Sequence, residues 1–133
     1  MFRVKYCREI ILKLLYQIDV LGLHGEKVED LLENNKNFFK DLTEIDIEFI
    51  VKIINQVQLG KESNDKLISR NLIGWKLDRL LPVDRSLIRM GIAESQFNDQ
   101  KAMIIDDIIR IAKKYGSEES YKIINAILDK VIK

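Results

Sequence analysis

The sequence predicts an all-α protein, a helical bundle of about seven helices. Apolar side chains recur at spacings of three and four along almost the whole chain, as on one face of an α-helix. Alternating, strand-like stretches are scarce, and six glycines with one proline in 133 residues disfavour a turn-rich sheet protein. The length is typical of one domain. We therefore expect a single domain, residues 1–133, with an N-terminal subbundle at about 1–60 and a C-terminal one at about 61–133.

The first helix is expected from about Val4 to Leu21, and Gly22 is placed to end it. One of its faces is apolar and should be buried. That face consists of Val4, Cys7, Ile11, Leu14, Ile18 and Leu21. A second set lies at helical spacing away from this stripe, and we expect it to be exposed. It consists of Lys5, Arg8, Leu12 and Tyr16.

Two further helices are expected in the acidic middle of the chain. Residues 26–39 carry apolar residues among acidic ones and predict a weaker amphipathic helix. Thr43 is followed three residues later by Asp46, which resembles a capping box at the start of a helix. The apolar positions from Ile47 to Val57 would form the buried face of that helix, and Gly60 would close it.

The polar stretch KESND, residues 61–65, is expected to be a linker followed by a helix to about Trp75. We expect the Trp75 indole to fill the core or the junction between the subbundles, with a binding anchor as the lesser alternative. Pro82 should lie in the first turn of the next helix, where its missing N–H is not needed. That helix is expected to reach about Phe97.

The last two helices follow a break at residues 98–101. The first of them should stop at Gly116. Ser117 is a good N-cap for the second, with Glu118 and Glu119 in its first turn. The two apolar faces consist of Ile104, Ile108, Ile111 and Tyr115, and of Tyr121, Ile124, Leu128 and Val131.

The charge of the chain is unevenly distributed. The overall net charge is +1, which gives no general signal for a polyanionic partner. Residues 1–25 carry a net charge of +2, residues 26–48 a net charge of −5, and residues 110–133 a net charge of +3. The two basic ends would form one basic patch if they meet in space.

The sequence favours a cytoplasmic protein without a membrane segment. A single cysteine excludes an intrachain disulfide, which fits a reducing compartment. No run approaches the ~18 apolar residues that a membrane span needs. The N-terminal apolar stretch is interrupted by Arg8, Glu9 and Lys13, unlike that of a signal peptide.

Residues suited to catalysis or metal binding are sparse. His24 is the single histidine and cannot build a common zinc site with one distant cysteine, so we expect a solvated loop histidine. Cys7 lies on the apolar stripe and is expected to be a small buried hydrophobe. Asp106 and Asp107 are adjacent and point to different sides of a helix, and we expect Asp106 to pair with Arg110. No glycine-rich phosphate loop is present. We expect no enzymatic activity, cofactor or metal.

The basic and aromatic side chains of the first helix are the better candidates for a binding site. Arginine and lysine can neutralise phosphates, and a tyrosine ring can stack on an unpaired base. From spacing alone, an ordinary solvated face with a Glu9–Lys13 ion pair is the more common alternative. A second basic cluster consists of Arg79, Arg85 and Arg89, the last two one helical turn apart. Solvent exposure is the default expectation, and the alternative is that Arg89 flanks the same groove.

Three segments match a known set of motifs, in order and over nearly the whole chain. CREIILKLLYQID is similar to A-R-E-x-A-x-Q-x-L-Y-x-x-D, and WKLDRLLPVDRSLIRMGIAE to W-x-L-x-R-L-x-x-V-D-R-x-I-L-R-x-A-x-Y-E. IAKKYGSEESYKIINAILDKV is similar to L-A-K-x-Y-G-x-x-x-S-x-x-F-V-N-G-V-L-D-K. These motifs belong to the NusB transcription antitermination proteins, and the chain therefore resembles that family. Together the three matches are specific, whereas one alone would be weak.

The resemblance implies an all-helical fold of two packed subbundles. It also implies binding of the boxA element of ribosomal RNA transcripts, as a heterodimer with NusE, a small-subunit ribosomal protein. That complex joins RNA polymerase and other Nus factors to suppress premature termination, without a metal or a catalytic step. Some members of the family self-associate, so a homodimer that hides the RNA surface is a further expectation.

The resemblance also implies which residues contact each partner. The expected RNA contacts are Arg3, Lys5, Arg8, Tyr16, Arg89, Tyr115 and Lys122. NusE docking is assigned mainly to the C-terminal subbundle, with Asp84 and Arg85 as its named residues.

The chain departs from the family pattern at several positions. Asp106 and Asp107 stand where the family usually has Asn and Glu, and the proline that usually precedes them is missing. Lys13 replaces the usual Gln, and Ile123 the usual Phe. The basic run at the N-terminus is also thinner than is usual. These departures put the role of the acidic pair and the affinity for RNA in question.

Two alternatives remain at this point. The chain could be a helical protein–protein interaction module with weakened or lost RNA binding, which the thinned basic run favours. It could also resemble the NusB-like domain that is appended to ribosomal RNA cytosine methyltransferases, but these 133 residues leave no room for a methyltransferase domain.

Overall fold

The computed structural model describes residues 2–74 and 76–133, and all of their regular structure is helical. The expected all-α class is therefore confirmed, whereas the expectation for Trp75 lies outside the described residues. The seven α-helices are α1 (Val4–Leu21), α2 (Val28–Asn34), α3 (Glu44–Leu59), α4 (Lys61–Arg70), α5 (Pro82–Ser95), α6 (Lys101–Tyr115) and α7 (Ser120–Val131). Two short 3₁₀ helices, Lys36–Phe39 and Leu77–Arg79, complete the described chain.

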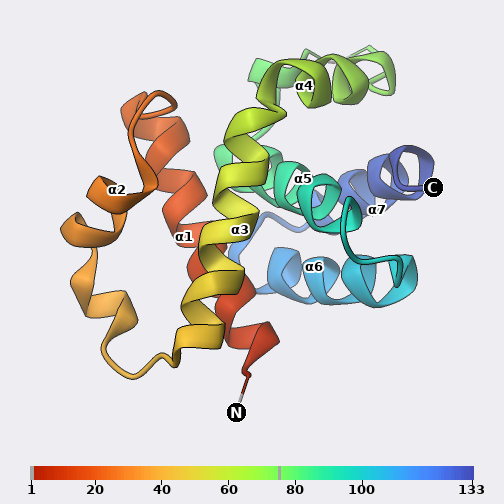
Figure 1. The fold of residues 1–133 in the computed structure, drawn as a ribbon. Coiled ribbons are helices and arrows are strands. Elements are labelled where there is room, and N and C mark those ends of the chain that lie inside the picture. Colours follow the sequence, from red (N-terminus) through yellow and green to blue (C-terminus); the bar gives the residue numbers. More distant parts are fainter. Residues whose placement is uncertain (1, 75) are drawn as a thin grey trace.

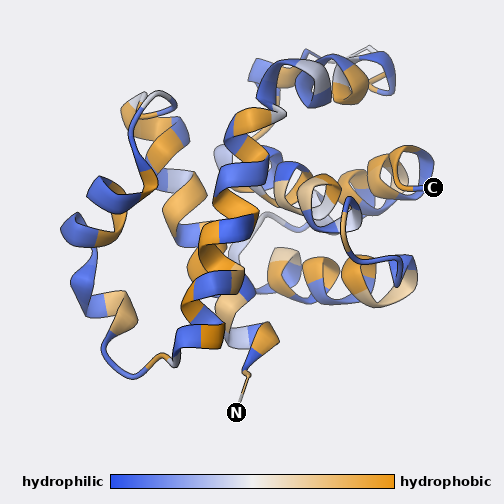
Figure 2. Cartoon of the chain, in the orientation of Figure 1, coloured by the Kyte–Doolittle hydropathy of each residue, from blue (hydrophilic) through white to orange (hydrophobic). Residues whose placement is uncertain are grey.

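Helix α5 lies at the centre of the bundle. It packs against α1 and α3 on one side and against α6 and α7 on the other (Figure 1). Apolar and polar stretches alternate along the helices (Figure 2), and the buried apolar side chains form one cluster to which both halves of the chain contribute. The division into subbundles near residue 60 stays a prediction.

Helix α1 has the predicted bounds but is buried on more of its surface than predicted. Gly22 caps it with φ +68°, a left-handed conformation that favours glycine. Four residues of the predicted stripe are buried, but Leu21 is 64% exposed. Because α3, α5 and α6 all contact α1, further side chains are covered. The additional buried residues are Arg8, Ile10, Leu12 and Leu15.

The predicted capping box starts α3. The Asp46 amide donates to Thr43 Oγ1 at 3.2 Å, and the Thr43 amide donates to Asp46 Oδ2 at 3.1 Å. The other carboxylate oxygen of Asp46 accepts from the Arg3 amide at 2.9 Å. That bond is the main cause that lowers the pKa of the buried Asp46 carboxyl to about 2. Asp46 therefore holds the beginnings of α1 and α3 together.

Two expectations for the polar segments were wrong. Residues 26–39 do not form one helix, because α2 ends at Asn34 and a 3₁₀ turn follows from Lys36. Residues 61–65 are not a linker, because α4 begins directly after Gly60. Ion pairs one turn apart, Lys61–Asp65 at 3.2 Å and Glu62–Lys66 at 3.5 Å, support this polar helix.

The helix boundaries in the second half of the chain differ from the prediction in two places. Helix α4 ends at Arg70 and does not continue to about residue 75, and the start of α7 also differs. Pro82 begins α5, and α6 stops before Gly116, both as predicted. Ser117 does not cap α7, which begins three residues later at Ser120. Instead, the Ser117 amide donates to Ser120 Oγ at 2.8 Å, so that a turn separates the two helices. No helix in the described part of the chain is long and apolar enough to cross a membrane.

Candidate nucleic-acid interface

Glu9 joins the exposed side of α1 to the last turns of α6. Its carboxylate accepts from Arg110 Nη1 at 3.0 Å, Lys114 Nζ at 2.8 Å and Tyr115 Oη at 2.9 Å. Burial alone would raise the pKa of Glu9, but the bonds from Lys114, Arg110 and Tyr115 together lower it to about 2. The carboxylate thus stays ionised and fixes three side chains of α6 beside α1.

A hollow of about 360 Å³ with three aromatic rings opens next to this junction. We call it the aromatic pocket. It brings together Tyr16 and Tyr115, two of the predicted site residues, and both rings are partly exposed. Lys13 Nζ lies 5.7 Å from the centre of the Phe38 ring and 5.9 Å from that of Tyr115. The lining residues are Leu12, Lys13, Tyr16, Gln17, Phe38, Val83 and Tyr115.

The aromatic pocket combines ring faces with positive charge. Lys13 stands over two of the rings, and Lys114 Nζ lies 5.2 Å from the Tyr115 ring centre. Stacking rings beside lysines are the usual composition of surfaces that hold unpaired bases and their phosphates. The arrangement can therefore bind a single-stranded nucleic acid without any metal or catalytic group.

Arg8 does not belong to the exposed face, and that expectation was wrong. It is 1% exposed, and its Nε and Nη2 donate to the two carboxylate oxygens of Glu94 at 2.8 and 2.6 Å. Its Nη1 donates to Asp107 Oδ2 at 2.9 Å. This position, directly after Cys7 of the apolar stripe, became buried because α5 and α6 both pack against α1. Arg8 is therefore a core ion-pair residue with no donors directed to solvent.

The same contacts explain the acidic pair on α6. Arg110 pairs with Asp107 at 2.6 Å and not with the exposed Asp106, contrary to expectation. Asp107 thus lies between Arg8 and Arg110, where it links a buried cation to one at the surface. The carboxylate at this position holds α6 against α1, which is a structural role.

Of the remaining predicted RNA contacts on α1 and α7, only Lys5 is linked to the Glu9 junction. Lys5 is exposed one turn before Glu9, and its carbonyl accepts from Arg110 at 3.5 Å. Arg3 is partly exposed; it stands over the Tyr6 ring and donates to the Asp41 carbonyl at 2.7 Å. Lys122 is exposed on α7.

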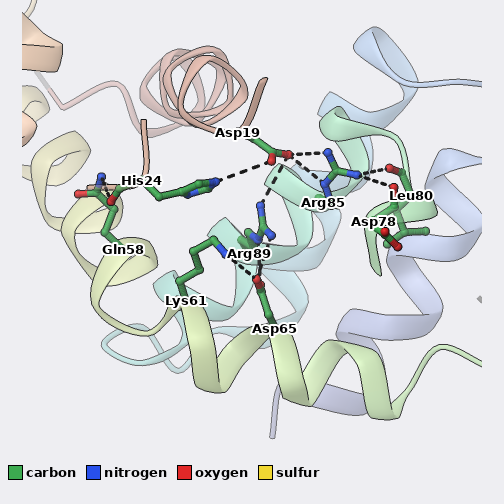
Figure 3. Close-up of polar contacts among 9 residues, drawn as sticks. All are labelled: Asp19, His24, Gln58, Lys61, Asp65, Asp78, Leu80, Arg85 and Arg89. Atoms are coloured by element: carbon green, nitrogen blue, oxygen red, sulfur yellow. Dashed lines mark hydrogen bonds and ion pairs between the residues drawn. The ribbon is translucent and has the colours of Figure 1, made fainter. Parts of the chain in front are cut away.

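Arg89 lies in a buried ion-pair cluster where α1, α4 and α5 meet, so the expected exposure was wrong (Figure 3). Its guanidinium donates to both carboxylate oxygens of Asp65, at 2.9 and 3.0 Å, and lies 3.7 Å from Asp19. Arg85 pairs with Asp19 at 2.9 Å and donates to the Leu80 carbonyl at 2.6 Å (Figure 3). These two arginines tie α5 to its neighbours.

The other residue assigned to partner docking, Asp84, is also covered. Its side chain is buried in the first turn of α5, and loss of solvent raises the pKa of the carboxyl above its ordinary value. One of its oxygens has no hydrogen-bond partner within the described residues. Asp84 therefore does not present its carboxylate on the surface of the free chain.

Sequence reasoning missed Lys13, Phe38 and Lys114 as parts of the site. Helical spacing alone predicts that Lys13 pairs with Glu9. In the structure Glu9 bonds to side chains of α6, and Lys13 lies over two aromatic rings. Its position three residues before Tyr16, on the same side of a helix, is a signal that could have identified it. Phe38 carries no such signal because it reaches the pocket from a 3₁₀ turn distant in sequence.

The histidine and the cysteine form no second site. Cys7 is fully buried as predicted, and burial raises the pKa of its thiol to about 12. His24 is partly buried and lies 3.9 Å from Asp19 (Figure 3). Among the described residues, no group of three potential ligands could hold a metal ion.

Comparison with known proteins decides the family. The model of the NusB family matches residues 6–133. The chain belongs to the NusB family. A transcription antitermination protein NusB from Clostridium botulinum strain Loch Maree is 35% identical, with 94% of this chain and 96% of that protein covered. One from Clostridium novyi strain NT is 32% identical, with 95% of each chain covered.

Two solved structures have the same fold. The T. maritima NusB crystal structure aligns with a TM-score of 0.85 and 31% identity, over 99% of this chain and 92% of that one. A chain in a crystal structure of a plectonemic RNA supercoil aligns with a TM-score of 0.83 and 27% identity, over 96% of this chain and 91% of that one. Membership of the NusB family confirms that the chain is a transcription antitermination protein and not an enzyme.

Proposed function

We propose that this NusB-family chain binds boxA-type RNA in ribosomal RNA transcripts together with a NusE ribosomal-protein partner, and that the complex acts with RNA polymerase and other Nus factors. The observation that carries the proposal is the aromatic pocket, where Tyr16 and Tyr115 meet beside Lys13. Rings of this kind stack on unpaired bases, and the adjacent lysines neutralise phosphates.

The Glu9 junction supports this surface by fixing its parts before RNA arrives. Tyr115 and Lys114 are both held by the Glu9 carboxylate, so less side-chain freedom is lost when a base stacks there. The same carboxylate reduces the positive charge of the surface. We therefore expect weak binding by the chain alone and stronger binding when a NusE partner adds its own contacts.

The test is the affinity for boxA-type RNA with and without NusE, at two salt concentrations. Tyr16→Leu should weaken binding by about 5- to 100-fold, because one base loses its stacking partner. Lys13→Glu should weaken it too and flatten the salt dependence by about one unit in the log–log slope. Sedimentation in the same buffers reports whether a homodimer covers the surface.

A matched control is Lys66→Glu. Lys66 is an exposed lysine on α4, 66% exposed at its side chain and outside the aromatic pocket. Its charge reversal should leave RNA affinity and salt slope unchanged within a factor of about two. Equal losses from Lys66→Glu and Lys13→Glu, or an affinity that NusE does not alter, would contradict the proposal.

A protein–protein module without RNA binding is the second candidate. The observation that favours it is the loss of free cations at the N-terminus, since Arg8 is buried and Arg3 contacts Asp41. Such a module should recover RNA polymerase factors from a lysate before and after nuclease treatment. Recovery that disappears after nuclease treatment would exclude it.

A further inference from the structure

A second hollow lies between α6 and α7, outside the aromatic pocket. Its volume is about 500 Å³, and it is open to solvent. We call it the α6–α7 hollow. Ile109 and the Tyr121 ring, both packed against the core, give it an apolar floor. The full lining is Asp106, Ile109, Arg110, Lys113, Tyr121 and Asn125.

Tyr121 has the features of a stacking platform. Lys113 Nζ lies 5.0 Å from the centre of its ring, and Lys122 Nζ lies 5.9 Å from it. The ring is partly buried, so it is held in place, yet it still lines an open hollow. Lys113 lines the hollow, whereas Lys122 lies outside the lining and pairs with Glu119 at 3.4 Å. Arg110 is already paired with Glu9 and Asp107, so Lys113 is the cation beside Tyr121 that suits an anionic ligand.

The α6–α7 hollow is continuous with the Glu9 junction. Arg110 lies on its rim and bonds at 3.0 Å to Glu9, which also accepts from Tyr115. The neighbouring residues Lys113 and Lys114 reach the Tyr121 ring and the Tyr115 ring, respectively. Side chains of α6 therefore link the two aromatic sites, with the Glu9 carboxylate among them.

We propose that the α6–α7 hollow binds a second unstacked base of the same single-stranded RNA, with Tyr121 as its stacking partner. Lys113 neutralises a flanking phosphate, and the Asn125 amide lines the hollow, where it can bond to a base edge. The inference rests on the proposed function, because it extends the same RNA track. A protein partner in this hollow is the competing outcome.

The test uses the full chain and a series of boxA-type RNAs lengthened one nucleotide at a time from either end. The affinity of the unmodified protein should rise in a step at the length where a base reaches Tyr121. Tyr121→Leu should remove that step, a loss of about 5- to 100-fold, and should leave the shortest bound RNA unaffected. Tyr121→Phe keeps a ring and should keep the step.

Two further measurements separate folding from binding. Lys113→Ser changes an exposed side chain. It should reduce the rise in affinity with RNA length and leave the midpoint of thermal unfolding unchanged. RNA that carries 5-bromouridine at successive positions should photocrosslink to peptides with Tyr121 from one position and to peptides with Tyr16 or Tyr115 from another. Both readouts remain informative if Tyr121→Leu folds poorly.

The outcomes distinguish this inference from the proposed function. One outcome would overturn the inference and leave the proposed function standing. In that outcome Tyr16→Leu no longer binds the shortest RNA, whereas Tyr121→Leu and Lys113→Ser still show the full rise in affinity with RNA length. Weaker NusE binding by Tyr121→Leu in the absence of RNA would assign the hollow to a protein and also overturn it. An unmodified protein that binds none of these RNAs with NusE present would overturn both.

Discussion

Arg8 is held by carboxylates from two different helices, Glu94 on α5 and Asp107 on α6. Arg8→Met should lower the free energy of unfolding by about 3–5 kcal/mol, because the buried Glu94 loses its cation and the buried Asp107 keeps only its pair with Arg110. Urea unfolding at neutral pH measures this loss. Lys13→Met, at an exposed site on the same helix, is the control and should cost little. Equal losses of unfolding free energy in the two variants would contradict a stabilising role for the buried ion pairs of Arg8 with Glu94 and Asp107.

Asp46 gives the stability of the chain a defined dependence on acid. Its folded-state pKa of about 2 lies below the ~3.9 of an unfolded aspartate, so its carboxylate stabilises the fold above pH ~4. That contribution decreases below pH ~4 and is lost as the pH falls through about 2. The stability difference between the unmodified protein and Asp46→Asn should therefore shrink as the pH is lowered from 7 towards 2.5.

The measurement for Asp46 is urea unfolding across that pH range, with the exposed Asp106→Asn as the control variant. The control should differ little from the unmodified protein at any pH. A stability difference for Asp46→Asn that stays constant down to pH 2.5 would show that its carboxylate does not carry the effect.

The turn between α6 and α7 depends on Gly116 for space and not for its φ angle of −90°. A Cβ at this position would lie 2.6 Å from Ser120 Oγ and 2.8 Å from the Ala112 carbonyl oxygen. Gly116→Ala should therefore destabilise the fold by about 1–3 kcal/mol. Gly25→Ala is the matched control because a Cβ there meets nothing within 4 Å. Thermal unfolding compares them, and equal midpoints would contradict the close approach.

At the level of the elements, local signals predicted the helices that carry their own start and stop residues. Gly22, the Thr43–Asp46 box and Pro82 marked boundaries that the structure has. The beginnings of α4 and α7 were mispredicted. A polar run such as KESND resembles a linker until its ion pairs are known, and Ser117 resembles a cap although its amide bonds to the Ser120 hydroxyl. These contacts join residues three or four apart, so their spacing is present in the sequence, but it indicates a contact only once the local backbone conformation is known.

The whole molecule should unfold in a single transition. Helix α5 contacts both halves of the chain, and one buried apolar cluster spans them. Far-ultraviolet circular dichroism and tyrosine fluorescence should therefore report the same midpoint in urea. Two separated midpoints would mean that the two subbundles unfold independently, against the shared core.

The sequence by itself determined the fold class, most helix bounds and the family, because periodicity, caps and ordered motifs are local properties of the chain. Through the family resemblance it also named Tyr16 and Tyr115 as candidate RNA contacts, and tertiary structure brings these two residues into one pocket. Only the tertiary structure decided which cations are available. Arg8 and Arg89 are covered because neighbouring helices supply carboxylates to them, whereas Lys13 stands over aromatic rings at the surface. The role of a basic side chain depends on which helices pack around it. The spacing of residues along one helix does not determine which other helices those are.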